Sequence, residues 1–97
     1  MIKILAKSEL KPGSWEKVGP LYQELIENTR KEEGCIEYGL FIDVKDENKC
    51  CFVEAWESEE ALTAHMNSAH FKRLLPQIRE FSAGSGEMTK LREFTIN

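Results

Sequence analysis

Residues 35–56, CIEYGLFIDVKDENKCCFVEAW, decide the fold that the sequence predicts. Two stretches of this segment, 35–44 and 50–56, are rich in β-branched and aromatic residues, which is typical of β-strands. The stretch between them, 45–49, is polar and turn-like. Because two strands joined by a short polar turn pair with each other, the segment predicts an antiparallel hairpin.

The position of the turn decides which residues of the hairpin face one another. A turn centred near Glu47 predicts three facing pairs, and their six side chains would share one face of the sheet because side chains alternate along a strand. A slip of one residue would move one strand's side chains to the opposite face. The predicted pairs are Ile42 with Phe52, Leu40 with Glu54, and Tyr38 with Trp56.

Before the hairpin, the sequence predicts one strand and one helix. Apolar residues recur at even positions from Ile2 to Leu10 with charges between them, which is the period of a strand. Ser14 is suited to cap a helix, and apolar residues three and four apart then indicate an amphipathic helix that ends near Gly34. Pro20 has no backbone N–H, so we expect a kink or a late helix start there.

After the hairpin, the sequence predicts two helical segments and a strand. Ser58 caps the first helix, whose early glutamates are favoured by the helix dipole. Asn67 and Ser68 indicate a break and a fresh cap, so a second helical segment follows and contains Pro76. Residues 87–96 complete the predicted elements as a last strand.

The predicted order β-α-β-β-α-β indicates a ferredoxin-like α+β sandwich. A chain of 97 residues has the size of one domain, so we expect a single domain over residues 1–97. Helices can cover only one face of such a sheet, yet the hairpin residues that would point to the other face are mostly apolar. Because soluble monomers rarely expose such a patch, we expect a homodimer joined through its sheets. These residues are Cys35, Gly39, Phe41, Cys51, Val53 and Ala55.

Composition and charge argue against several classes of protein. The net charge of −4 argues against a nucleic-acid partner, and no run approaches the roughly 20 apolar residues of a membrane span. The first ten residues lack the small-residue cleavage site of a signal peptide, so we expect a cytoplasmic protein. The cysteines are odd in number and two are adjacent, which predicts reduced thiols rather than a disulfide framework.

The candidate site lies in residues 54–71, EAWESEEALTAHMNSAHF. In the predicted helix, His65 shares a face with Ala61, Leu62 and Met66. Imidazole titrates near neutral pH, so His65 could act as a base or a hydrogen-bond donor in a pocket. The alternative is a core histidine whose ring bonds to a backbone group.

Three neighbours of His65 have similar alternatives. Glu54 lies in mid-strand, where a buried carboxylate needs a partner; His65 or the N-terminus of the following helix could serve, or Glu54 could be purely structural. Trp56 could form the wall of a pocket for a flat ligand or pack in the core. His70 would converge with His65 only if the helix breaks at residues 67–68, and otherwise lies on the rim. A metal site from His65, His70 and Glu54 would lack the H-x-x-x-H spacing.

Several short motifs resemble those of the antibiotic biosynthesis monooxygenase domain family. The segments Glu54-x-Trp56, Ala61-Leu62-x-x-His65 and Ser68-x-His70-Phe71 resemble its central motif. The segments Lys11-Pro12-Gly13 and Glu33-Gly34-Cys35-Ile36-x-Tyr38 are similar to its other recurrent segments. Each motif is unspecific alone, but together they follow the family's order over essentially the whole chain.

The resemblance implies a dimeric α/β barrel with a pocket between the sheet and the helices. For many members it implies oxygenation of a small aromatic or quinol-like substrate by dioxygen, with no metal or flavin cofactor. Such chemistry needs a base, an apolar wall and little water. The resemblance suggests His65 as the base or hydrogen-bond partner and Glu54 as the orienting carboxylate, with Trp56, Tyr38, Leu62 and His70 binding the substrate.

Departures from two branches of the family narrow the expected activity. The haem-degrading branch pairs an Asn in the first strand with a helical Trp and a His ten residues later; the first strand here has no Asn, and His65 and Leu75 stand at the other positions. The polyketide-oxidising branch uses an Asn and a Tyr around the strand Trp, where Phe52 and Leu62 stand here. The chain therefore resembles the small bacterial quinol monooxygenase group. The alternatives are an isomerase or tautomerase of a small oxygenated metabolite, and a non-catalytic dimer that binds a ligand or haem.

Overall fold

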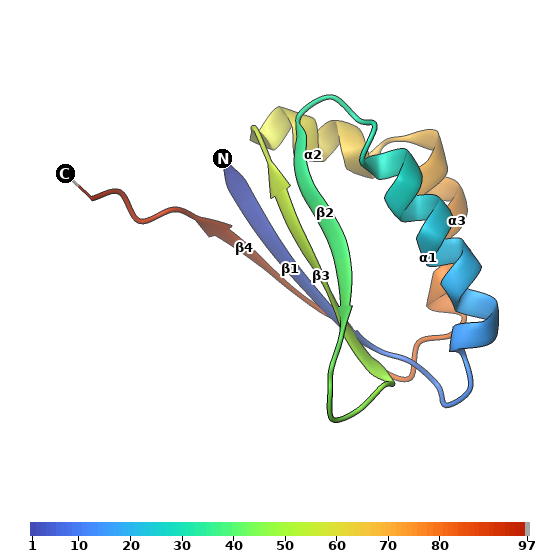
Figure 1. Ribbon diagram of the computed structural model, residues 1–97. Coiled ribbons are helices and arrows are strands. Elements are labelled where there is room, and N and C mark those ends of the chain that lie inside the picture. The colour runs from blue at the N-terminus through green and yellow to red at the C-terminus, as the bar shows by residue number, and fades with distance from the viewer. Residues whose placement is uncertain (97) are drawn as a thin grey trace.

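The computed structural model describes residues 1–96, and its strands and helices follow the predicted order, with the second helical region divided in two (Figure 1). The strands form one antiparallel sheet in the order β2-β3-β1-β4. This topology confirms the predicted ferredoxin-like α+β fold. The elements are β1 (Ile2–Glu9), α1 (Trp15–Thr29), β2 (Cys35–Ile42), β3 (Lys49–Trp56), α2 (Glu59–Met66), α3 (Ala69–Arg79) and β4 (Glu87–Arg92).

The helices lie on one face of the sheet and leave the other face bare (Figure 1). A cluster of buried side chains fills the space between the two layers and includes Ile4 of β1, Leu25 of α1 and Leu74 of α3. Every element except β4, whose residues are all exposed, contributes its apolar stripe to this core. A site between the sheet and the helices therefore has apolar surroundings.

The hairpin joins β2 and β3 as predicted, but the predicted pairing is wrong by two residues. Tyr38 pairs with Glu54, so the centre of the turn lies at Asp46 and not at Glu47. A shift of two residues preserves the alternation of side chains, and the predicted face therefore still points toward the helices. The side chain of Asp46 stabilises this turn by accepting a hydrogen bond from the backbone N–H of Asn48 at 3.0 Å.

A β-bulge at the start of β2 corrects the prediction for one cysteine. Cys35 pairs with Trp56 and Glu37 with Ala55, so the residue between them is an extra residue of the bulge. The extra residue reverses the alternation of side chains. Cys35 consequently packs against the core, whereas Phe41 stands on the bare face with 60% of its surface exposed.

Helix α1 begins at Trp15 and continues through Pro20, so the late start that Pro20 suggested is wrong. The helix ends at Thr29, earlier than predicted, and the turn that follows leads to Gly34 with a φ of +86°. A Cβ atom on Gly34 would lie 2.5 Å from the Cβ atom of Ala61. Glycine at this position therefore allows both the positive φ and the close approach of α2.

Two serine caps divide the second helical region, as predicted. Ser58 Oγ accepts a hydrogen bond from the N–H of Ala61 at 3.1 Å, and Ser68 Oγ accepts one from the N–H of Phe71 at 3.4 Å. Ser68 Oγ also donates a hydrogen bond to the carbonyl oxygen of His65, which lies near the end of α2. The fresh start of α3 changes the direction of the chain between the two histidines of the sequence.

Strand β4 ends at Arg92 and is shorter than the predicted strand over residues 87–96. The residues after it extend away from the sheet (Figure 1), and Phe94 is 83% exposed. The three cysteines are free thiols, as predicted. Within residues 1–96, every helix is too short or too polar to cross a membrane.

Candidate active site

A pocket of about 470 Å³ lies between the sheet and the helices. Its volume is in the range of small-molecule sites, roughly 300–1,000 Å³. Most of its lining is apolar, and the buried residues that line it come from six of the elements. These residues are Ile4, Tyr22, Leu25, Tyr38, Phe52, Glu54, Leu62, His65 and Ile78.

His65 is the buried imidazole of this pocket. It projects from α2 and is only 2% exposed. Aromatic rings surround its imidazole, with centroid distances of 4.7 Å to Trp56, 4.7 Å to Phe71 and 5.3 Å to Tyr38. These contacts hold the ring in one orientation, which a catalytic base requires.

Glu32 determines which nitrogen of His65 carries the proton. Its Oε2 atom lies 2.8 Å from His65 Nδ1. A carboxylate can only accept hydrogen bonds, so we assign the proton of neutral His65 to Nδ1, which leaves a lone pair on Nε2. Burial lowers the pKa of His65, and the hydrogen bond to Glu32 opposes that shift.

His70 shares the same carboxylate oxygen. Its Nε2 atom lies 2.8 Å from Glu32 Oε2 and 3.3 Å from Ser68 Oγ. The start of α3 thus brings His70 to the same carboxylate as His65, which an unbroken helix would not do. Glu32 and His70 are 15% and 19% exposed, so this side of the cluster reaches solvent.

Glu54 has a different partner from those expected. Its Oε1 atom accepts a hydrogen bond of 3.0 Å from the indole N–H of Trp56, and neither His65 nor the N-terminus of α2 provides that bond. Burial raises the pKa of Glu54, and the nearby charge of Glu32 adds to the shift. The carboxylate bonded to His65 is therefore Glu32 and not Glu54, and burial shifts Glu54 toward its protonated form.

Tyr38 contributes a phenol to the same pocket. Burial raises its pKa, and the charges of Glu54 and Glu32 raise it further. The side chain is therefore a neutral hydrogen-bond donor at physiological pH. Its ring also packs on Phe52, with a centroid distance of 5.0 Å.

The predicted site residues divide into two groups. Four of them line the pocket: Tyr38, Glu54, Leu62 and His65. Trp56 is fully buried and supports His65 and Glu54, and His70 bonds to Glu32 outside the pocket lining. Glu32, Phe71 and Tyr22 were not among the predicted site residues. Phe71 and Tyr22 had the periodicity of core residues, whereas nothing in the sequence distinguishes Glu32 from the neighbouring Glu33.

The cluster of Glu32, His65 and His70 also has the composition of a metal site. One ligand atom from each residue lies within 4.8 Å of the other two. This cluster differs in its carboxylate from the combination of His65, His70 and Glu54, which the sequence did not favour as a metal site; Glu54 instead accepts the hydrogen bond from the indole of Trp56.

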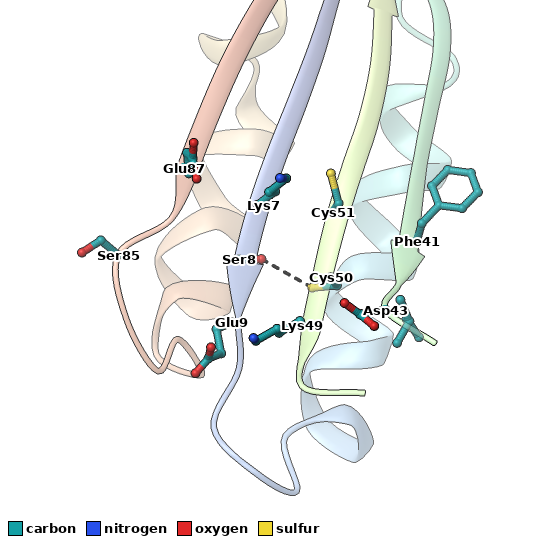
Figure 2. A pocket seen from close by; sticks show the side chains of 11 residues that line it. Lys7, Ser8, Glu9, Phe41, Asp43, Lys49, Cys50, Cys51, Ser85 and Glu87 are labelled. Carbon is teal, nitrogen blue, oxygen red and sulfur yellow. Dashed lines mark hydrogen bonds between the residues drawn. The ribbon is translucent and has the colours of Figure 1, made fainter. Parts of the chain in front are cut away.

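A second hollow, of about 480 Å³, opens on the bare face of the sheet (Figure 2). Lys7, Cys51 and Phe41 lie along its walls, and Lys49 and Glu87 add exposed charges. Water screens exposed charges, so they provide a weaker environment for chemistry than buried groups. The pocket that contains His65 is therefore the candidate active site.

The fold and this pocket define a class of protein. The sequence profile of the family described as antibiotic biosynthesis monooxygenase matches residues 1–77, and the chain belongs to this family. The family name points to monooxygenase chemistry.

Individual relatives match over most of their length. The chain is 34% identical to the protein YcnE of Bacillus subtilis strain 168 over 80 residues, which cover 82% of this chain and 84% of that protein. A solved structure of an antibiotic biosynthesis monooxygenase has a TM-score of 0.94 and 37% identity, covering 98% of this chain and 100% of that chain. A conserved protein from Methanosarcina mazei Go1 has a TM-score of 0.93 and 33% identity, covering 96% and 92%.

Proposed function

We propose that the protein is a cofactor-independent monooxygenase that oxidises a small quinol-like or phenolic metabolite. The observation that carries the proposal is the bond between Glu32 and His65 at the wall of a mostly apolar pocket. This arrangement provides a base held in one tautomer next to space for an aromatic ring. Membership of the monooxygenase family supports dioxygen as the second substrate.

The first step is removal of a proton from a substrate hydroxyl by His65 Nε2. The charge of Glu32, 2.8 Å from Nδ1, stabilises the imidazolium that forms. The resulting phenolate is electron-rich and passes one electron to dioxygen. The apolar lining favours this step because it keeps water away from the reactive anion.

The substrate radical and superoxide then combine, forming a C–O bond at a ring carbon that carries hydrogen. His65 returns its proton to the peroxide, the carbon loses its hydrogen as a proton, and the O–O bond breaks with release of water. For a hydroquinone, the overall reaction converts the hydroquinone and dioxygen into a hydroxyquinone and water. One oxygen atom enters the product and the other leaves as water.

The phenol of Tyr38 and the carboxyl of Glu54 line the pocket and can bind the other oxygen of the substrate. Burial raises the pKa of both Tyr38 and Glu54, which shifts both groups toward their protonated forms. A protonated carboxyl or phenol donates a hydrogen bond to a substrate oxygen without adding a negative charge that would repel the phenolate. A base and separate hydrogen-bond donors in one pocket favour substrates that carry oxygen atoms at two positions of the ring.

Oxygen uptake with a panel of benzo- and naphthohydroquinones tests the proposal, with the rate of spontaneous oxidation subtracted. We expect turnover by the wild type and a loss of about 10²–10⁴-fold in kcat for His65→Ala, the usual contribution of a general base. Circular dichroism establishes that the variant is folded. Equal rates for the two proteins would remove His65 from the mechanism.

A second candidate, isomerisation or tautomerisation of a small oxygenated metabolite, is favoured by one observation. The base His65 and the carboxyl of Glu54, whose pKa is raised, line the same pocket and could move a proton between two positions of a substrate. Strict exclusion of oxygen separates the two candidates. An isomerase keeps its full rate under those conditions, and a monooxygenase stops.

We also propose that the protein is a homodimer joined through the bare face of its sheet. Apolar side chains on this face include Phe41, 60% exposed, and Leu91, 42% exposed. A second copy of the sheet would bury them. Sedimentation should give a dimer for the wild type and a monomer for Phe41→Lys. Val44→Lys, in the exposed hairpin turn, makes the same change outside the sheet and should leave the dimer intact.

A further inference from the structure

We propose that Glu32, His65 and His70 form a binding site for a divalent transition-metal ion such as Zn²⁺. Glu32 Oε2 lies 2.8 Å from both His65 Nδ1 and His70 Nε2. The ligand atoms of all three residues lie within 4.8 Å of one another. One ion at the centre of this cluster could therefore contact all three after small movements of the side chains.

The arrangement of the cluster favours binding because the fold already holds the ligands together. Glu32 follows α1, His65 lies in α2, and His70 lies in the first turn of α3. The ring of His65 is packed between Trp56 and Phe71, each at a centroid distance of 4.7 Å. An ion would therefore meet at least one ligand whose orientation is already fixed.

The protons of the two histidines can rearrange without a change in their charge. With both rings neutral, each now donates its N–H to the carboxylate of Glu32. On metal binding, the proton of His65 moves from Nδ1 to Nε2, and the proton of His70 moves from Nε2 to Nδ1. The ion then meets two neutral imidazoles and one carboxylate, a ligand set with a charge of −1.

This ligand set favours some ions over others. Imidazole nitrogens suit Zn²⁺ and its transition-metal neighbours, whereas Mg²⁺ and Ca²⁺ prefer sites made of oxygen. The partly exposed side chains of Glu32 and His70 give an ion a route from solvent. Ser68 Oγ, 3.3 Å from His70 Nε2, could bond to a water molecule on the ion.

Metal binding has a consequence for catalysis that rests on the proposed function. A metal on Nδ1 requires neutral His65 to carry its proton on Nε2, the atom that faces the substrate in the proposed mechanism. The base thereby becomes a hydrogen-bond donor. We therefore expect Zn²⁺ to inhibit oxygenation and a chelator to restore it.

The test measures metal binding itself on the full chain without an affinity tag. Zn²⁺ is added in calorimetry and in ¹⁵N spectra of the imidazole rings, which are simple because the chain has two histidines. We expect one ion per chain, coordination at His65 Nδ1 and His70 Nε2, and a proton on His65 Nε2. Unchanged ring spectra at saturating Zn²⁺ would overturn the proposal. This outcome includes the case in which the ion binds to cysteine thiols and not to the histidines.

Variants provide the matched comparison. We expect Glu32→Gln and His70→Ala to weaken Zn²⁺ binding by about 100-fold or more, because loss of a ligand costs at least as much as loss of a group that supports one. Glu33→Gln removes the same charge from the exposed neighbour and should bind as the wild type does. Equal binding by Glu32→Gln and Glu33→Gln would overturn the site. Zn²⁺ binding is measured without turnover. A protein that binds Zn²⁺ but has no oxygenase activity would therefore refute the proposed function and leave the metal site intact.

Discussion

Replacement of Glu32 by Gln separates the charge of this residue from its shape. Glu32 Oε2 contacts the nitrogens of His65 and His70 at 2.8 Å, and the amide oxygen of Gln can accept the same hydrogen bonds. The substitution therefore removes the negative charge that stabilises the imidazolium of His65 after proton transfer. We expect a lower kcat and an unchanged KM, since Glu32 does not line the pocket.

The size of the loss follows from the distance. Opposite charges about 4 Å apart interact by about 4 kcal/mol at an effective dielectric constant near 20, a value suited to the partly exposed Glu32. Roughly half of this is lost in the variant, because the oxygen is shared with His70 and an amide dipole remains. A loss of about 2 kcal/mol corresponds to a decrease of about 30-fold in kcat.

The assay is oxygen uptake with a hydroquinone at several concentrations, so that kcat and KM are obtained separately. Glu33→Gln is the matched control because it removes an equal charge one residue away, and it should keep the wild-type kcat. If Glu32→Gln kept kcat within about twofold of the wild type, the charge of Glu32 would play no part in proton transfer and the reasoning would be refuted.

Three further predictions concern stability, measured by urea unfolding. Trp56→Phe removes the donor to buried Glu54 and should lower the free energy of unfolding by about 1–3 kcal/mol; an unchanged value would contradict the role of that bond. Gly34→Ala should lower the free energy of unfolding more than Gly13→Ala does. Both glycines have a positive φ, but only a Cβ atom at Gly34 would contact Ala61. Equal losses of stability would show that α2 can move away from the added methyl group. Since burial raises the pKa of folded Glu54 above its unfolded value, the stability from its protonated form is present at acidic pH and is lost as the pH rises through the folded pKa. Glu54→Gln should thus gain stability over the wild type from acidic to neutral pH, and a difference that does not vary with pH would contradict the shift.

Local patterns in the sequence were enough to predict the fold. The strand alternation and the caps at Ser58 and Ser68 act over a few residues and do not depend on distant contacts. The hairpin register depended on the exact turn, and the preference for a turn at Asp46 over Glu47 comes from side-chain hydrogen bonds that composition does not reveal. No local sequence pattern indicated the bulge that turns Cys35 toward the core.

The site was predictable only where it depended on helix or strand periodicity. His65 and Leu62 share a helix face and Glu54 lies on the covered face of the sheet, so all three were identified. Glu32 lies in a polar turn, and only the folded chain brings it to His65, 33 residues away in sequence. The sequence could therefore indicate the buried imidazole but not the carboxylate bonded to it.

Turnover of a hydroquinone under ¹⁸O₂ tests the central claim most directly, since the claim is that the pocket around His65 inserts oxygen from dioxygen. We predict one ¹⁸O atom in the hydroxyquinone product and the second in water, with no product when oxygen is excluded. A product without ¹⁸O, after control for exchange with water, or product formation at an undiminished rate without oxygen, would contradict the account.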